Sequence, residues 1–162
     1  MTIRLALFQP DIPQNTGTML RLAACLNVGV DIIEPCGFVW SEAKMKRAGM
    51  DYLRHVDLVR HRSWDFFRQQ TGPRRLVLLT TKTDRAYTDF QFRPDDCLMV
   101  GRESAGVPDD VHNNSDEQIT IPMAPAMRSI NVAMSAAMVL GEALRQTDGF
   151  PLKNTQTTET AL

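Results

Sequence analysis

The sequence predicts an α/β fold in which a parallel β-sheet is sandwiched between helices. Short, almost wholly apolar runs such as Leu76–Thr81 and Leu98–Val100 are typical of strands buried on both faces. Segments with helical spacing of apolar residues alternate with these runs, as they do in βαβ units. The 162 residues, 43% of them hydrophobic and 23% charged, suit one domain with its own core. We assign that domain to residues 1–150 and expect a polar, disordered tail over residues 151–162.

Capping and breaking residues set the bounds of the elements in the first half of the chain. Asn15 or Thr16 can cap the first helix, and Gly29 follows its end. Ser63 can cap a later helix that stops at Gly72. In order, the expected elements are a strand over Ile3–Phe8, a helix over Asn15–Leu26, a strand over Val30–Ile33, a short basic helix over Ser41–Ala48, an extended run over Val56–Val59 and a helix over Trp64–Gln70.

The pattern of apolar residues in the second half of the chain predicts further buried strands and one long helix. The strands are expected over Leu76–Thr81, Leu98–Val100 and Gln118–Ile121, and the helix over Val132–Gln146. This last helix is apolar on nearly every side up to Glu142. Such a helix needs cover on more than one side. Either a second subunit packs against it, or it lies wholly inside the monomer.

The connection between the last strand and this helix is suited to holding a ligand. Pro122 and Pro125 stiffen it, because proline fixes φ at about −65° and removes a backbone donor. The remaining N–H and C=O groups can then face something other than the chain itself. The alternative is a plain connection in which Ser129 or Asn131 caps a core helix.

Composition and missing motifs narrow the function class. The three cysteines and three histidines stand at spacings that predict neither a disulfide framework nor a metal site. No apolar run is long enough for a signal peptide or a membrane span, so we expect a cytoplasmic protein. The motifs G-x-G-x-x-G, G-x-x-x-x-G-K-[ST], G-x-S-x-G and H-E-x-x-H are missing too, which disfavours ordinary nucleotide-binding and hydrolase classes.

Charge is segregated along the chain, although the net charge is only −1. Between Lys44 and Arg85 there are eleven Lys and Arg residues against four acidic ones, so the remainder of the chain is acidic. Lys and Arg contacts to phosphate supply most sequence-independent affinity for nucleic acids. The basic middle therefore indicates an RNA or DNA partner, unless it consists of solvated helix faces whose charges happen to cluster.

Two further segments follow strands and carry residues suited to binding. After the first strand, Gly17 and Arg21 are four residues apart and so lie on one face of the first helix. After the strand that ends at Val100, Gly101 and Gly106 permit turns that bring backbone amides close to a ligand. Each segment alone could be an ordinary loop or a solvent-facing turn of helix.

Together and in this order, the three segments resemble the SPOUT superfamily of RNA methyltransferases, and within it the small TrmL (YibK-type) branch. The match extends from Ile3 to Arg145. It is carried by P-x-I-P-x-N-x-G-x-x-x-R at 10–21, G-x-E-x-x-G-x-P at 101–108, I-P-M at 121–123 with R-S-x-N at 128–131, and by I-E-P-x-G-F at 33–38, R-A-G-x-D-Y at 47–52 and T-T-K at 80–82. The resemblance implies a C-terminal part threaded as a trefoil knot, a homodimer, and S-adenosylmethionine as the methyl donor, with S-adenosylhomocysteine as product.

In this family, backbone groups of the loops after three strands hold the donor in a bent conformation. The resemblance maps these groups to Leu79, Gly101, Ile121 and Ser129, with Met123 nearby. The residue types agree with that role, because adenine needs an apolar slot with a few amide partners. Leu79, Ile121 and Met123 can line the slot, Gly101 permits close approach, and Ser129 can satisfy a polar edge.

The reaction that the resemblance implies is methyl transfer to a ribose 2′-OH, with no metal. It puts Arg21 at the reacting hydroxyl, although a guanidinium, with a pKa of about 12.5–13.8, is a poor base. Arg21 either is neutralised locally and accepts the proton, or holds the adjacent phosphate and stabilises the forming alkoxide. Asn15 and Asn131 are candidates to orient Arg21 or the ribose. Glu103 can pair with Arg21 or Arg128, serve as the base, or act as a structural ion-pair partner.

We expect the catalytic unit and its twin to bind the RNA themselves. Arg128 can bind a phosphate, or it can cap a helix or face solvent. In the basic middle, the residues that can follow phosphates include Lys46, Arg47, Arg60 and Arg62. Aromatic residues such as Trp40 can stack on an unpaired base, or pack in the core.

The resemblance implies a tRNA anticodon loop as substrate, methylated on the ribose of a wobble cytidine or uridine, with leucine tRNAs as the expected species. A single-stranded loop offers a nucleotide that a protein can reach, so substrate and chemistry are compatible. Three alternatives stay open. They are a 2′-O-methyltransferase of another tRNA or rRNA nucleotide, a noncatalytic RNA-binding protein on the same scaffold, and an α/β enzyme acting on a small molecule.

Overall fold

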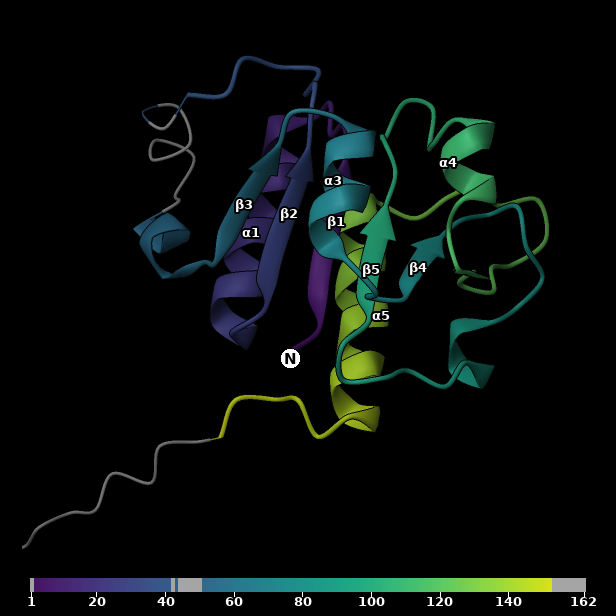
Figure 1. Cartoon of the computed structure of the whole chain (residues 1–162). Helices are drawn as coiled ribbons and strands as arrows, with labels where there is room; N and C mark the ends of the chain where they lie inside the picture. Colours follow the sequence, from purple (N-terminus) through teal and green to yellow (C-terminus); the bar gives the residue numbers. More distant parts are fainter. Residues whose placement is uncertain (1, 42, 44–50, 153–162) are drawn as a thin grey trace, which may run out of the picture.

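A single six-stranded sheet forms the centre of the protein, whose computed structural model describes residues 2–41, 43 and 51–152 (Figure 1). All strand pairs are parallel, and the spatial order is β3-β2-β1-β5-β4-β6. The strands are β1 (Arg4–Phe8), β2 (Gly29–Ile33), β3 (Leu58–His61), β4 (Leu76–Leu79), β5 (Cys97–Val100) and β6 (Glu117–Ile119). The predicted α/β class with a parallel sheet is confirmed.

Helices cover both faces of this sheet (Figure 1). The long helices α1 (Pro13–Leu26) and α5 (Val132–Gln146) pack against each other on one face. The shorter helix α3 (Trp64–Thr71) lies on the other face, and α4 (Asp109–Asn113) follows the loop after β5. Two 3₁₀ helices, η1 (Asp51–His55) and η2 (Tyr87–Asp89), complete the described elements.

The core has two layers, one on each face of the sheet. Along β1, Leu5 and Leu7 belong to the cluster that contains the buried residues of α1 and α5. Ala6 and Phe8 belong to the cluster on the opposite face, with Phe67 of α3. Successive side chains of a strand point to opposite faces, so burial on both faces demands the continuous apolar run seen in the sequence.

An ionic cluster ties the first three strands together. The Asp31 carboxylate on β2 accepts from Arg4 Nε on β1 at 2.6 Å and lies 2.8 Å from His61 Nε2 on β3. Asp31 and His61 are 3% and 2% exposed. Arg4 also pairs with the exposed Asp57. A buried carboxylate with partners on both sides is tolerated because its charge is balanced and its oxygens are hydrogen-bonded.

Several predicted bounds were wrong. Helix α1 begins at Pro13 with Ile12 as its N-cap and no side-chain cap bond, so Asn15 and Thr16 lie inside the helix. The left-handed residue at its end is Asn27, with φ of 54°, and Gly29 opens β2 instead. Proline suits the first helical position because its missing N–H would have no partner there.

In the rest of the chain most strand and helix bounds differ from the predicted ones by one or two residues, whereas α5 has the predicted bounds. The run expected over Val56–Val59 is replaced by β3 at Leu58–His61. Strands β4 and β6 end earlier than predicted, and α4 was not predicted at all because it is only five residues long. The helix expected over Ser41–Ala48 lies largely outside the described residues, as do residues 153–162 of the expected tail.

The sheet order positions the functional loops. The chain runs from β1 outward to β2 and β3, then returns to the other side of β1 with β4, β5 and β6. In open parallel sheets, ligands bind beyond the carboxyl ends of the strands where the order reverses. Here the reversal falls between β1 and β5. Among the described residues, every helix is too short or too polar to cross a lipid bilayer.

Candidate functional site

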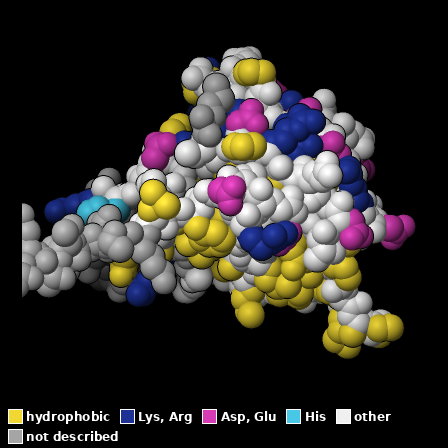
Figure 2. Space-filling view, turned by 90° about the horizontal axis from the view of Figure 1, so that it is seen from below, with side chains coloured by type: hydrophobic (Ala, Val, Ile, Leu, Met, Phe, Trp, Pro, Cys, Tyr) yellow, Lys and Arg dark blue, Asp and Glu magenta, His cyan; other side chains and the backbone are white. Residues whose placement is uncertain are grey.

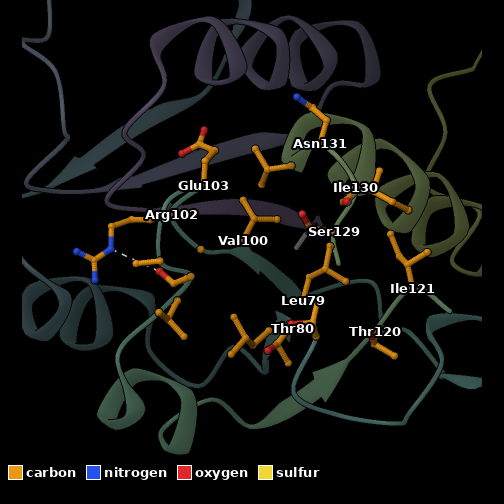
Figure 3. Close-up of a pocket in the computed structure, with 18 of the residues that line it drawn as sticks. Leu79, Thr80, Val100, Arg102, Glu103, Thr120, Ile121, Ser129, Ile130 and Asn131 are labelled. Carbon is orange, nitrogen blue, oxygen red and sulfur yellow. Dashed lines mark hydrogen bonds between the residues drawn. The ribbon is translucent and has the colours of Figure 1, made fainter. Parts of the chain in front are cut away.

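A cavity of about 510 Å³ opens beyond the carboxyl ends of β4 and β5 (Figure 3). Three loops supply most of its wall: Thr80–Lys82 after β4, Gly101–Gly106 after β5, and the segment from Ile121 to Val132 that leads into α5. Ile12 and Asn15, at the start of α1, close a further side. Segments that are far apart in the sequence therefore meet around one hollow.

All five residues predicted to bind the donor line this cavity: Leu79, Gly101, Ile121, Met123 and Ser129. In Figure 3, Leu79 and Val100 lie near the centre beside Ser129, and Ile130 and Asn131 lie at the start of the yellow-green helix α5. The apolar side chains Ile130 and Val132 extend the wall. An apolar slot edged by hydroxyl and backbone groups is a typical small-molecule site.

The structure adds a second reason for a glycine at position 101. A Cβ at this position would lie 2.7 Å from the backbone carbon of Gly106, so the absent side chain allows the loop to close on itself. The loop is closed by two backbone hydrogen bonds between Arg102 and Gly106, at 3.0 and 2.8 Å. Gly106 has a φ of 63°, which favours glycine. The loop is thus preformed by its own contacts.

A directed chain of hydrogen bonds links the three sequence motifs. The Asn131 side-chain oxygen Oδ1 accepts from the N–H groups of Ala133 and Met134 and caps α5. Its amide nitrogen donates to Asn15 Oδ1 at 3.1 Å, and Asn15 Nδ2 donates to Glu103 Oε1 at 3.2 Å. Because the helix cap fixes one end and a carboxylate the other, both amide groups have a single orientation.

Glu103 does not have the ion pairs that were considered for it. In the described part of the chain, its hydrogen bonds are with Asn15 and with Asp11, not with Arg21 or Arg128. Burial, and next the neighbouring Asp11 side chain, raise the pKa of Glu103 above its usual value. The pKa of Asp11 is lowered to about 2, chiefly by its hydrogen-bonding interaction with Glu103 and then by the Ser104 hydroxyl. Two adjacent carboxyl groups separate their pKa values in this way.

Arg21 lies outside the group of residues that line the cavity. It is exposed on α1, and its Cζ atom stands 4.9 Å from the centroid of the Tyr52 ring. The predicted catalytic set is therefore only partly assembled. Asn15, Glu103 and Asn131 are joined in one network, whereas Arg21 is held by an aromatic ring from η1.

The predicted RNA-binding residues are scattered. Arg128 is exposed at the edge of the cavity. Arg60 pairs with Glu34 and stacks on Trp40, with its Cζ 4.9 Å from the ring centroid. Arg62 is exposed and lies over Phe66. The remaining two, Lys46 and Arg47, lie outside the described residues.

Two contacts near the site were not predicted from the sequence. Asp11 bonds to the loop after β5, and Tyr52 stacks on Arg21. A usable signal existed for Asp11, because an acidic residue shortly after a buried strand lies at the edge where ligands bind. Tyr52 was considered from the sequence as a residue that stacks on a base or packs in the core, but its contact with Arg21 was not predicted, since Arg21 comes from a different helix.

A family model described as SpoU rRNA Methylase matches residues 2–141, which contain every residue that lines the cavity. The chain belongs to the SpoU rRNA methylase family. The predicted methyltransferase class is thereby confirmed, and the cavity lies in the part of the chain that defines a SpoU methylase.

Relatives of this SpoU methylase carry more specific names. The chain is 63% identical over 145 residues to a tRNA (cytidine(34)-2'-O)-methyltransferase of Beijerinckia indica, covering 88% of this chain and 90% of that protein. Among solved structures, one described as giving insights into the 2-OH methylation of C/U34 on tRNA is similar with a TM-score of 0.84. That similarity has 37% identity and covers 90% of this chain and 95% of the other.

A further SpoU methyltransferase, AviRb from Streptomyces viridochromogenes, has been solved in complex with the cofactor AdoMet. It is 29% identical, with a TM-score of 0.76, and the match covers 90% of this chain and 60% of that one. The SpoU fold is thus shared with enzymes of different lengths.

Proposed function

We propose that this protein methylates the ribose 2′-OH of the wobble pyrimidine, C or U at position 34, in the anticodon loop of tRNA, with leucine tRNAs as the expected substrates. The observation that carries the proposal is the 63% identity to a tRNA (cytidine(34)-2'-O)-methyltransferase across nearly the whole of both chains. The similar structure concerned with C/U34 on tRNA supports both pyrimidines as substrates.

The methyl donor in this proposal is S-adenosylmethionine, which supplies a methyl group on a cationic sulfonium. The AdoMet complex of AviRb supports this choice. The cavity fits such a molecule, because its volume of about 510 Å³ lies within the usual range of about 300–1,000 Å³ for small-molecule sites. Leu79, Ile121 and Met123 would line the apolar part, and Ser129 and the backbone at Gly101 would meet polar edges.

The chain's own residues then act on the ribose. Asn15 and Asn131, held in fixed orientation, can present their amides to the incoming sugar. The 2′-OH has to lose its proton, and Glu103 is a candidate acceptor because its raised pKa brings it closer to the working pH. Arg21 would bind the adjacent phosphate or stabilise the developing alkoxide, and Arg128 would hold a second phosphate.

The proposed assembly is a homodimer in which α5 contributes to the interface. Seven residues of α5 are buried, yet Met134 and Met138, four residues apart on one face, are 63% and 41% exposed. Gly141 continues this face, and a Cβ there would meet nothing within 4 Å. A second copy would cover this apolar stripe. The family resemblance supports the dimer, and Met134→Glu with Met138→Glu should convert it to monomers in light scattering.

We further propose the C-terminal trefoil knot and a cytoplasmic location. The loops after β4 and β5 and the segment that leads into α5 surround one cavity, in keeping with a knot that encloses the donor. The location follows from the substrate, since a tRNA-modifying enzyme acts where tRNA is.

The decisive experiment is nucleoside mass spectrometry. Purified protein is incubated with S-adenosylmethionine and tRNA, and the RNA is digested to nucleosides and to anticodon-loop fragments. We expect 2′-O-methylcytidine or 2′-O-methyluridine at position 34. Methylation at another tRNA position or in rRNA would replace the substrate but keep the enzyme class. Absence of donor binding in calorimetry, together with absence of any methylated product, would instead point to a noncatalytic RNA-binding protein.

A further inference from the structure

Asp11 and Glu103 form a reciprocal pair between two loops. The Asp11 N–H donates to Glu103 Oε2 and the Glu103 N–H donates to Asp11 Oδ1, both at 3.1 Å. The Ser104 hydroxyl donates to the second oxygen of Asp11. Strands β1 and β5 are neighbours in the sheet, so the loops at their carboxyl ends lie side by side although the two acids are 92 residues apart. Asp11 itself is not among the residues that line the cavity.

The segment after β2 supports Asp11 from another side. The Gly37 N–H donates to the carbonyl of Pro10 at 2.9 Å. A Cβ on Gly37 would lie 2.5 Å from the Asp11 Cβ and 2.9 Å from its Cα. The glycine therefore permits a close approach that any other residue would prevent. Asp11 is packed between Gly37 and the loop after β5.

These contacts fix the orientation of the Glu103 carboxylate. One oxygen accepts from the Asp11 N–H and the other accepts from Asn15 Nδ2. With its nitrogen committed to Glu103, Asn15 presents its oxygen to Asn131. The geometry of three cavity residues thus depends on a contact made outside the cavity.

We propose that Asp11 is a positioning residue: its carboxylate holds the backbone of Glu103 and the hydroxyl of Ser104, and so places the Glu103 side chain and, through it, the amides of Asn15 and Asn131. The proposal rests on the proposed function for its activity readout. Its structural readout, the state of the two asparagine side chains, is independent of which RNA is methylated.

The first test compares Asp11→Ala with Asp11→Asn. Removing the carboxylate should lower kcat for methyl transfer about tenfold to a hundredfold, as small misplacements of reacting groups do. Donor affinity should stay unchanged, because Asp11 is not among the residues that line the cavity. We expect the KM for tRNA to stay unchanged as well. Asparagine can still accept from the Glu103 N–H, so Asp11→Asn should recover much of the activity.

The pH profile separates the charge of Asp11 from its anchoring role. Burial and, after it, the neighbouring Asp11 carboxylate raise the pKa of Glu103, so neutralising Asp11 in Asp11→Asn should lower that pKa. If the reaction requires ionised Glu103, the acidic limb of the kcat profile should move to lower pH in this variant. A purely structural defect would lower kcat equally at every pH.

Gly37→Ala offers a second variant that leaves the chemistry of Asp11 intact. The added methyl group should displace Asp11 and reduce kcat as Asp11→Ala does. The matched control is Asp148→Asn, an isosteric change at an exposed residue beyond the far end of α5. Asparagine tolerates the left-handed conformation of Asp148, whose φ is 51°, so this control should behave as the wild type.

The structural readout is the side-chain NH₂ signals of Asn15 and Asn131 in NMR spectra, assigned by single substitution. We expect slow solvent exchange in the wild-type protein and faster exchange in Asp11→Ala and Gly37→Ala. Unchanged signals together with unchanged kcat would overturn the proposal. A parallel loss of folding, donor affinity and activity in both Asp11→Asn and Gly37→Ala would also reject it, since it would indicate a general structural role. Altered signals in a protein that methylates no tRNA would reject the proposed function while supporting the role of Asp11.

Discussion

The contact with the Tyr52 ring favours one position of the exposed Arg21 side chain. An arginine on a helix surface samples many rotamers, but here its Cζ is 4.9 Å from the centroid of the Tyr52 ring. Cation–π contacts at exposed sites contribute about 0.5–1 kcal/mol. That is enough to favour one position of the guanidinium without making it rigid.

Replacing Tyr52 should therefore affect catalysis through Arg21. We expect Arg21→Ala to abolish methylation while donor binding survives, and Tyr52→Ala to lower kcat severalfold without changing donor affinity. Tyr52→Phe keeps the aromatic face and should retain activity. Single-turnover methylation and calorimetric donor titration would measure both effects. Equal loss of activity in Tyr52→Phe and Tyr52→Ala would argue for the hydroxyl instead of the ring.

Asn131 has two tasks, as the N-cap of α5 and as a member of the hydrogen-bond chain. Asn131→Asp keeps the oxygen that accepts from Ala133 and Met134 but cannot donate to Asn15. We expect this variant to unfold at the same denaturant concentration as the wild type and to lose most of its methylation activity. Asn131→Ala should lose both functions, at a cost of about 1 kcal/mol in stability. Full activity in the aspartate variant would contradict a role for the amide donor.

The ionic cluster of β1, β2 and β3 should dominate the stability of that side of the sheet. Asp31→Ala leaves Arg4 and His61 without their shared buried partner, and removing one member of a buried pair costs about 3–5 kcal/mol. Asp57→Ala removes a second partner of Arg4 whose side chain is 70% exposed, so its cost should be about 0–1 kcal/mol. Urea unfolding of the two variants compares them directly. Similar costs for both would show that burial of Asp31 has little effect.

Elements were predictable where a local signal agreed with tertiary packing. Helix α5 was placed at its observed bounds because Asn131 caps it and an apolar run fills it. The start of α1 was missed because Ile12 is an N-cap without a side-chain bond, so the conventional search for Asn or Thr selected the wrong residue. The stack of Arg21 on Tyr52 depends on the packing of η1 against α1, which no periodicity encodes.

At the scale of the whole molecule, the distribution of surface charge could not be predicted from the sequence. The basic middle was read as one cationic surface, but acidic residues from other parts of the chain neutralise much of it. The ion pairs concerned are Arg60–Glu34, Arg68–Asp116, Arg75–Asp96, Lys82–Asp109 and Arg85–Glu117. On the face drawn in Figure 2, dark blue Lys and Arg side chains lie beside magenta Asp and Glu side chains. The segregation of charge along the sequence therefore overstates the basic surface that is left for RNA. By contrast, the convergence of the loops that line the cavity was predictable, because parallel strands bring their carboxyl ends to one edge.

The ion pairs distinguish between two arginines that were predicted to bind RNA. Within the described part of the chain, Arg62 lies over the Phe66 ring and has no acidic partner, whereas Arg60 forms an ion pair with Glu34. We expect Arg62→Gln to weaken tRNA binding and to reduce the slope of log affinity against log salt by up to about 0.9, the value for one phosphate contact. Arg60→Gln should have a smaller effect, and Arg145→Gln, which removes a partner of Glu142, should have none. A normal slope for Arg62→Gln would exclude it from the RNA surface.

The bond between Asn15 and Asn131 joins residues 116 positions apart, so it governs when the protein becomes competent during synthesis. The ribosome delivers the first strand and helix early, but the amide that completes the pocket emerges only with the last helix. A nascent chain that stalls before that point has no finished pocket with which to capture its cosubstrate. We therefore expect polypeptides that end before Asn131 to be inactive as methyltransferases.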